Sequence, residues 1–291
     1  MKLFKKLFTA AIIILIIVSI GGIIYVLQFQ EETPAIKETK KAAGKTIKKA
    51  VVSKRGTSKA LSSKSVPLRE VAIIIDDIGY DLNLAKELLK INADLTFAIV
   101  PFQAHSREAA QMFHNANKET LLHLPMEPVS YPREKPGEGA LFTDMSDEEI
   151  VLQLKENLAA VPYISGVNNH MGSKFMMDEQ KLSLIFKELK KRNLFFVDSR
   201  TSADTRTLSA AQKTGIKVAE RKIFIDNNRN YKEIYNNLMK VAQGDDVSPK
   251  IIIGHPYPET VRALKAATEV LREKGVLIVP ASQIIKKTKT S

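Results

Sequence analysis

From Pro67 onwards the sequence alternates short apolar runs with longer amphipathic segments, and this alternation limits the fold more than any other feature. The apolar runs predict strands near residues 71–76, 95–100, 120–124, 166–170, 194–198, 216–219, 251–254 and 276–279. The amphipathic segments predict helices over residues 82–91, 107–117, 150–161, 181–192, 231–242 and 259–274. Helices of this length between buried strands are typical of repeated βα units and of a parallel sheet.

The number of predicted strands favours an α/β fold in which the sheet closes into a (β/α)7-8 barrel. An open, doubly wound parallel sheet is the alternative. Such open sheets often carry a glycine-rich phosphate-binding motif after the first strand. Here the first strand is followed only by Asp77-Ile-Gly-Tyr80, so the sequence favours the barrel.

The positive charge of the chain is concentrated near its N-terminus. The net charge is +12, but residues 1–69 contain 14 Lys and Arg against 3 Asp and Glu, which leaves 30 basic and 29 acidic residues for the rest. A nucleic-acid-binding domain carries its basic charge on the folded surface. We therefore expect no nucleic-acid partner. The chain has no cysteine, so disulfide bonds have no part in its stability.

The first 66 residues have two parts of different composition. Residues 1–30 begin with three lysines and continue as an almost uncharged apolar stretch. This stretch is long enough to anchor the chain in a membrane as a helix, with its N-terminus in the cytoplasm; a cleaved secretion signal is the alternative. Residues 31–66 are rich in Lys, Ala, Ser and Thr and predict a flexible basic linker. Residues 67–291 form the barrel domain, which is exported in either case.

Residues that bind metals or transfer protons follow four of the predicted strands. They are Asp76 with Asp77, His123, His170 and His255. In parallel α/β folds the carboxyl ends of the strands face one side, where ligands bind and catalysis takes place. Two histidines and a carboxylate can hold zinc and leave coordination positions open. A further histidine suits proton transfer to a leaving group, because free imidazole titrates at about pH 6.5. The pattern predicts a metal-dependent hydrolase.

The adjacent carboxylates of Asp76 and Asp77 are expected to take different roles. In a regular strand their side chains point to opposite faces. The chain turns at a strand end, so both can reach the site, where one binds a metal and the other accepts a proton from water. Three further residues are candidates for substrate binding: Asn169, Asp198 and Glu127. For Asp198, orientation of the His255 imidazole and a structural role in capping the following loop are the alternatives, and Asp226 is a similar case whose role stays open.

Five short motifs occur in an order that resembles the polysaccharide deacetylases, most closely their divergent branch in bacteria. These motifs are Ile75-Asp-Asp-Ile-Gly79, His123-Leu-Pro-Met-Glu-Pro128, Asn169-His-Met-Gly-Ser173, Asp198-Ser-Arg-Thr-Ser202 and Gly254-His-Pro256. The resemblance covers residues 68–288. It implies a distorted (β/α) barrel, a divalent metal that is usually zinc, and the removal of N- or O-acetyl groups from glycans.

The resemblance also implies roles for individual residues. It makes Asp76 the general base, Asp77 a metal ligand, and His255 the general acid. His123 matches the first histidine of the family's His-x-x-x-His element, whose second histidine is replaced here by Glu127. Our candidate for the third metal ligand is His170, because it ends the next predicted strand, and Glu127 is the alternative.

These observations predict a zinc-dependent hydrolase of the bacterial cell envelope that removes acetyl groups from a polysaccharide or a peptidoglycan-type glycan. The alternative is a catalytically inactive barrel that binds envelope glycan or a protein partner, which the altered His-x-x-x-Glu element favours. We expect a single-pass anchor in the inner membrane with the barrel outside the cytoplasm. If the signal is cleaved, the barrel is instead secreted to the periplasm.

Overall fold

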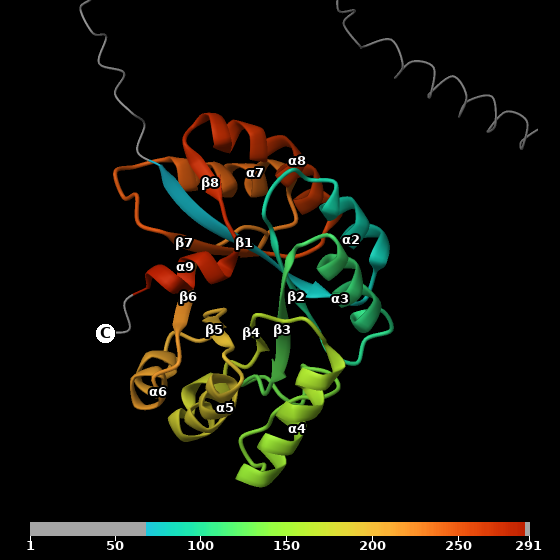
Figure 1. Cartoon of the computed structure of the whole chain (residues 1–291), viewed down its shortest axis with the longest axis vertical. Helices are drawn as coiled ribbons and strands as arrows, with labels where there is room; N and C mark the ends of the chain where they lie inside the picture. The colour runs from blue at the N-terminus through green and yellow to red at the C-terminus, as the bar shows by residue number, and fades with distance from the viewer. Residues whose placement is uncertain (1–67, 289–291) are drawn as a thin grey trace, which may run out of the picture. The chain divides into compact units, whose positions relative to one another are not determined.

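In the computed structural model, which describes residues 68–288, parallel strands alternate with helices (Figure 1). The strands are β1 (Arg69–Ile78), β2 (Thr96–Ile99), β3 (Glu119–Met126), β4 (Gly166–Met171), β5 (Phe195–Asp198), β6 (Val218–Phe224), β7 (Lys250–Gly254) and β8 (Val276–Ile278). The α-helices are α2 (Leu82–Leu89), α3 (Ser106–Asn115), α4 (Asp147–Ala160), α5 (Glu179–Lys191), α6 (Thr207–Thr214), α7 (Tyr231–Met239), α8 (Pro258–Glu273) and α9 (Ala281–Lys287). Two short 3-10 helices are η1 (Phe175–Met177) and η2 (Lys240–Ala242).

The predicted anchor over residues 1–30 and the linker over residues 31–66 both lie outside the described residues. Between residues 68 and 288, no helix has the length and apolar character needed to cross a bilayer.

Seven strands form a closed parallel barrel, and an eighth strand lies beside it. The order is β2-β3-β4-β5-β6-β7-β1-β8, and a further pairing between β1 and β2 closes the ring. The first residues of β1, Arg69–Val71, pair with β8, whereas its later residues, from Ile74 onwards, pair with β2. The barrel is therefore distorted at β1, where the register shifts between Ile75 and Ile78. The predicted distorted (β/α) barrel is confirmed.

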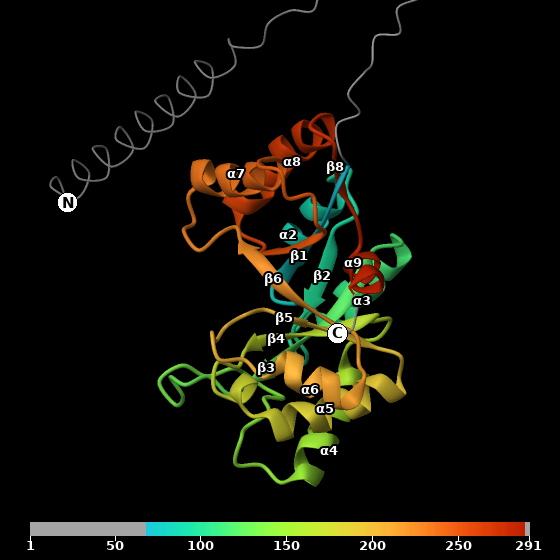
Figure 2. The same ribbon diagram turned by 90° about the vertical axis from the view of Figure 1, so that its left-hand side faces the viewer.

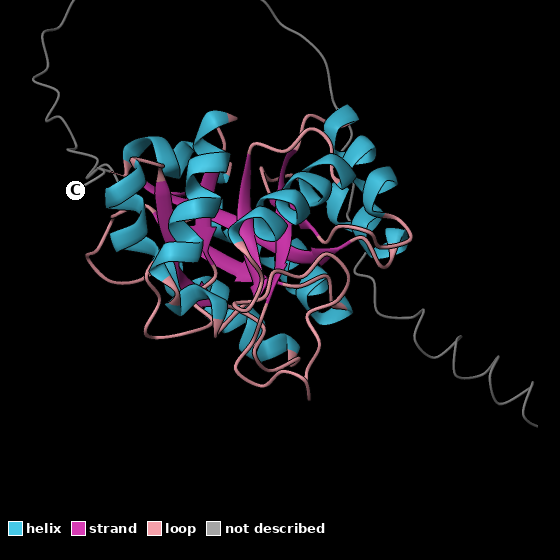
Figure 3. Cartoon of the chain, turned by 90° about the horizontal axis from the view of Figure 1, so that it is seen from below, coloured by secondary structure: helices cyan, strands magenta, loops and turns pink. Residues whose placement is uncertain are grey.

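Two apolar layers hold the barrel together. The strands alternate, so that one set of side chains, including Ala72, Ile74 and Ile253, forms one buried cluster with residues of α9. The other set, including Ile73 and Ile75, packs in a larger cluster with residues of the surrounding helices. Figure 3 shows these helices around the strands, and Figure 2 shows α4, α5 and α6 on one side of the barrel and α7 and α8 on the other.

Most elements lie where the sequence predicts them, with three differences. The helices α6 and α9 were not expected, and β6 covers Val218–Phe224 instead of residues 216–219. The side chains of β6 are mostly partly exposed, and the strand contains Glu220, Arg221 and Lys222, so no apolar run marks it. The two helices are short, at 8 and 7 residues, which leaves few turns in which a helical period can be recognised.

Candidate metal centre and active site

The alternation of side chains along β1 determines which way Asp76 points. Ala72 and Ile74 belong to the cluster that contains α9, and Asp76 is the next residue on the same face of β1. Asp77 would face the opposite way in a regular strand. Its φ of +55° turns the backbone at this point, a left-handed conformation that Asp adopts more readily than most residues. The expectation that both carboxylates reach one site agrees with this geometry.

The same alternation determines which way two of the three histidines of the site point. His123 follows Leu121 at a spacing of two in β3, and His255 follows Ile253 at the same spacing just beyond β7. All of these strands are parallel, so their carboxyl ends open on one side of the barrel. Residues that are far apart in the sequence therefore line a single cleft.

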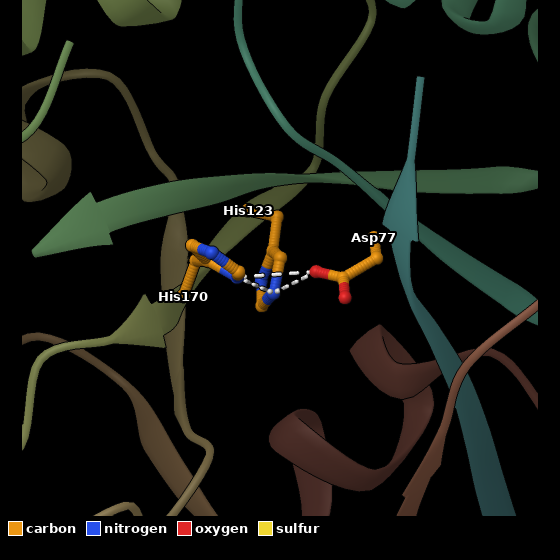
Figure 4. A group of neighbouring side chains, drawn as sticks. All are labelled: Asp77, His123 and His170. Atoms are coloured by element: carbon orange, nitrogen blue, oxygen red, sulfur yellow. Dashed lines mark hydrogen bonds and ion pairs between the residues drawn. The ribbon is translucent and has the colours of Figure 1, made fainter. Parts of the chain in front are cut away.

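Three ligand atoms converge in this cleft, as Figure 4 shows. The Oδ1 atom of Asp77 lies 3.3 Å from Nε2 of His123 and 3.1 Å from Nδ1 of His170. The two histidine nitrogens lie 3.1 Å apart. Among residues 68–288, this is the group of three His, Cys, Asp or Glu side chains whose ligand atoms lie close enough to share one metal ion.

These separations fit a small divalent cation. Donor atoms placed tetrahedrally at about 2.0–2.1 Å from a zinc ion lie about 3.3 Å from one another. Asp77 Oδ1 is also buried and has no hydrogen-bond partner among the described residues. A buried polar atom of this kind is costly unless something satisfies it. A cation between the three atoms would do so, which makes Asp77, His123 and His170 a candidate metal centre.

Asn168 fixes the orientation of His123. Its Oδ1 lies 2.9 Å from Nδ1 of His123, and its Nδ2 donates to Oδ1 of Asp76 at 2.8 Å. With the amide NH2 group facing the carboxylate, Oδ1 must accept the Nδ1 proton of His123. The neutral imidazole then presents the lone pair of Nε2 to Asp77 and His170. Such support of a ligating histidine is typical of metal sites in proteins.

The electrostatics of the cluster favour positive charge between its members. Burial would lower the pKa of His123, but the carboxylates of Asp76 and Asp77 more than compensate and raise it. Burial would likewise raise the pKa of Asp77, but its close contacts with His123 and His170 outweigh this and lower it strongly. A cation bound between these side chains would be stabilised by the same carboxylates.

Asp76 has the environment of a base. It is almost fully buried, and this burial is the main reason that its pKa is raised, although His123 and His255 partly oppose the rise. Its Oδ1 accepts the bond from Asn168, while its Oδ2 lies 3.6 Å from Nε2 of His123, beside the candidate metal centre. A carboxylate with a raised pKa accepts a proton more readily at neutral pH.

His255 and Asp226 form a hydrogen-bonded pair beside the cluster. The Nδ1 atom of His255 lies 3.1 Å from Oδ1 of Asp226, and the backbone N–H of His255 donates to Oδ2 at 2.6 Å. Thr260 also donates to Oδ2 at 2.8 Å, so the carboxylate is held firmly. The other ring nitrogen, Nε2, lies 3.8 Å from Oδ2 of Asp77. Burial would lower the pKa of His255, but the contact with Asp226 and the nearby Asp76 and Asp77 carboxylates raise it.

The cluster opens into a cleft with a volume of about 290 Å³. This cleft gives a substrate access to both the candidate metal centre and His255. The residues that line it are Asp76, Asp77, His123, Asn169, His170, Met171, Ser199, Arg200, Thr201, Arg221, Phe224, Asn227 and His255.

Two of the residues expected to bind substrate have carboxylates that are bound elsewhere. Glu127 accepts hydrogen bonds from the backbone and side chain of Thr143 and pairs with Lys174 at 2.7 Å. Asp198 accepts bonds from the backbone of Arg200 and from two threonine hydroxyls within the following loop and helix. Neither residue lines the cleft, because these contacts turn both carboxylates towards the surrounding loops.

The third candidate, Asn169, does line the cleft. However, its amide bonds to the backbone of Ser199 and Met171, so it also joins the loops that follow β4 and β5. The structure thus brings Asp76, Asp77, His123, His170 and His255 together, and Asn169 lies beside them. Glu127, the alternative third ligand, is not part of the cluster. The geometry instead offers His170 as the third ligand.

Sequence reasoning gave no role to Asn168, and it left Asp226 undecided. The position of Asn168 carries a usable signal, because it precedes His170 by two residues and therefore shares its face of β4. Asp226 carries no such signal. It lies 29 residues before His255, and only the folded barrel brings the two together.

The barrel and its Asp/His/His cluster have the architecture of a deacetylase-like protein. A family model described as divergent polysaccharide deacetylase matches residues 73–285, so the chain belongs to this family. The resemblance seen in the five sequence motifs is thereby confirmed.

Two bacterial proteins match most of this chain. Uncharacterized protein YibQ of Escherichia coli K12 is 37% identical over 230 residues, which cover 78% of this chain and 70% of YibQ. An uncharacterized protein of Haemophilus influenzae Rd is 30% identical over 218 residues, which cover 75% and 77% of the two chains. The crystal structure of uncharacterized protein ATU2773 from Agrobacterium tumefaciens C58 has the same fold, with a TM-score of 0.70 at 20% identity over 76% of this chain and 90% of that one.

The two candidate third ligands give a direct test of the metal centre. We expect the purified full-length chain to bind about one equivalent of zinc, and His170→Ala to weaken this binding at least about tenfold, because it removes one of three converging donors. Glu127→Gln serves as the matched control and should leave zinc affinity unchanged, since its carboxylate is bound to Thr143 and Lys174. Zinc titration followed by elemental analysis measures both. Loss of zinc in the Glu127 variant alone would contradict the assignment.

Proposed function

We propose that the chain is a metal-dependent hydrolase that removes acetyl groups from a polysaccharide or a peptidoglycan-type glycan of the cell envelope. The observation that carries this proposal is the triangle of Asp77, His123 and His170, with Asp76 and His255 beside it and a cleft above it. Membership of a deacetylase family supports the reaction type.

Asp77, His123 and His170 are the residues that would hold the metal. Two imidazoles and one carboxylate suit zinc among the common divalent cations. A divalent cation at this position supplies Lewis-acid chemistry, which polarises an acyl carbonyl and makes water more acidic.

Asp76 acts as the general base in this proposal. Asn168 holds its Oδ1 at 2.8 Å, and Oδ2 remains directed towards the cluster. This oxygen can accept the proton of a water molecule that attacks the acyl carbon. Because burial raises the pKa of Asp76, the carboxylate binds this proton more readily than an exposed aspartate would.

His255 acts as the general acid. The attack of water produces a tetrahedral species whose collapse expels an amine or an alkoxide, and this leaving group needs a proton. Asp226 engages Nδ1 of His255, which orients the ring so that Nε2 faces the cleft. The raised pKa of His255 keeps this nitrogen protonated over a wider pH range than in free histidine.

The geometry weakens the argument for an inactive, glycan-binding barrel. That alternative rested on the exchange of the family's second histidine for Glu127. In the structure the carboxylate of Glu127 ties Thr143 to Lys174, and His170 approaches the cluster from the next strand. Three candidate metal ligands therefore lie beside the proposed base and the proposed acid, which supports an enzymatic role. A protein that only binds glycan has no need of this acid–base pair.

Replacement of the base tests the enzymatic proposal. Asp76→Asn should lower the rate of acetate release from N- or O-acetylated glycans by about 100-fold or more, the usual contribution of a general base. Zinc content should remain intact, because Asp76 is not one of the three converging ligands. Asp204→Asn, in the exposed loop after β5, removes the same charge and should leave the rate unchanged. Full activity of the Asp76 variant would exclude it as the base.

The pairing of Asp226 with His255 predicts a change in pH dependence. A general acid must be protonated, so activity is lost as the pH rises through the pKa of His255. Asp226→Asn removes contacts that raise this pKa, so the alkaline limb of the pH–rate profile should move to lower pH. Thr260→Val removes one hydrogen bond to Asp226 but keeps the carboxylate, and its alkaline limb should stay close to that of the wild type. An unmoved limb in the Asp226 variant would refute the pairing as functional.

We also propose that the barrel works outside the cytoplasm of a bacterial cell. The support is the composition of the N-terminus, where residues 1–30 have the basic start and apolar stretch of an anchor or signal and residues 31–66 resemble a linker. Protease added to spheroplasts should digest a tethered barrel while the inner membrane is intact, and a cleaved form should appear in the periplasmic fraction. Protection of the barrel until the membrane is lysed would contradict the proposal.

A further inference from the structure

Arg221 is a cleft residue to which the hydrolytic mechanism gives no role. It belongs to β6, and its guanidinium group lines the same cleft as the candidate metal centre. Its Nε donates to the carbonyl of Ser199 at 2.7 Å, and its Nη2 donates to the carbonyl of Arg200 at 3.1 Å. The ring of Phe224 lies 5.0 Å from its Cζ atom. The side chain is thus held in one orientation.

The positive charge of Arg221 has no ion-pair partner among residues 68–288. Its two hydrogen-bond acceptors are neutral carbonyls, and they fix the group without compensating its charge. The neighbouring Arg200 differs, because its guanidinium lies 3.4 Å from Glu220. Burial lowers the pKa of Arg221, and the Asp198 and Asp76 carboxylates oppose this only from a distance. Charged groups that are partly removed from water are usually paired.

The structural role of Arg221 uses only part of the hydrogen-bonding capacity of its guanidinium group. The bonds to Ser199 and Arg200 join β6 to the loop after β5, and they use two of the five N–H groups of the guanidinium. Both bonds lie on the edge formed by Nε and Nη2. On the other edge, Nη1 and the second N–H of Nη2 have no hydrogen-bond partner among the described residues. This edge offers two parallel N–H groups, the arrangement that binds a carboxylate or a phosphate through two hydrogen bonds.

We propose that Arg221 binds an anionic group of the substrate, a carboxylate or a phosphate carried by the sugar that is deacetylated or by its neighbour. The inference rests on the proposed function, and it narrows the substrate class to acidic acetylated glycans. The candidate metal centre receives the neutral acetyl group, and Arg221 in the wall of the same cleft receives the anion. The two contacts together fix the direction in which the glycan lies.

Three related sugars test this inference by direct binding to the zinc-loaded, full-length chain. N-acetylglucosamine is neutral, N-acetylmuramic acid adds a carboxylate to the same ring, and N-acetylglucosamine 6-phosphate adds a phosphate. Calorimetric titration should show that at least one acidic sugar binds about tenfold or more tightly than the neutral one, as expected for hydrogen bonds to a charged group. Which acidic sugar is preferred distinguishes a carboxylate from a phosphate as the source of the anion.

If the proposal is correct, the preference for acidic over neutral sugars depends on Arg221. Arg221→Gln should reduce the ratio of acidic to neutral affinity to near one, whereas a structural role alone would weaken all three sugars alike. Lys222→Gln is the matched control, because it removes a positive charge from the adjacent, exposed position of β6 and should keep the ratio. Arg221→Lys retains the charge without the planar fork and should give an intermediate ratio. It serves as the test if the glutamine variant does not fold, as judged by circular dichroism.

The outcomes separate this inference from the proposed function. Equal affinities for the three sugars, no measurable binding of any of them, or a preference that survives in Arg221→Gln would overturn the role of Arg221. Acetate release from neutral acetylated glycans would still support the hydrolase in that case. If the acidic preference is found but no acetylated glycan is hydrolysed, the binding role of Arg221 stands and the proposed hydrolysis fails.

Discussion

The pairing of β1 is the constraint on which the rest of the structure depends. This strand lies between β7 and β8, and its carboxyl end also pairs with β2, so it closes the ring. Asp76 and Asp77, near its carboxyl end, therefore lie where the two ends of the sheet meet. The proposed base and one candidate metal ligand come from this single strand end, and the candidate ligands from β3 and β4 reach them only because the ring is closed there.

Closure alone does not explain the geometry of the cluster, because three electron-rich atoms within about 3 Å of one another repel. Rigid support holds them in place. Asn168 fixes the ring of His123 and one oxygen of Asp76, and the turn at Asp77, with its φ of +55°, aims its carboxylate into the cleft. A site that is organised before its ligand arrives loses less free energy in binding it. The backbone strain at Asp77 and its buried Oδ1, which has no hydrogen-bond partner among the described residues, are therefore concentrated where a cation would relieve them.

Sequence reasoning finds a site residue where an apolar strand run leads directly to it. The runs of β1, β3 and β7 are apolar and end abruptly in Asp76, His123 and His255, so strand ends and site residues are found together. It fails where contacts are made between distant loops. Asp198 and Asp226 are both almost fully buried, yet the carboxylate of Asp198 caps its own loop and that of Asp226 engages His255, the proposed general acid. No local pattern distinguishes these outcomes. The strand β6, which carries Arg221, was misplaced because its polar, partly exposed sequence has no apolar run to mark it.

The register between β3 and β4 explains how the barrel can offer a third ligand without the family's second histidine. His123 lies beside Asn168, and the register continues so that Pro125 lies beside His170. Asn168 is therefore level with His123 and supports its ring, while His170 stands two residues nearer the mouth, about 7 Å along the strand. From there its Nδ1, rather than Nε2, reaches back to Asp77 and His123. The position of the lost histidine is then free for Glu127, whose carboxylate ties the following loop to Lys174. A one-residue shift in this register would turn both Asn168 and His170 away from the cleft, so the strand pairing, more than any single motif, defines the set of candidate ligands.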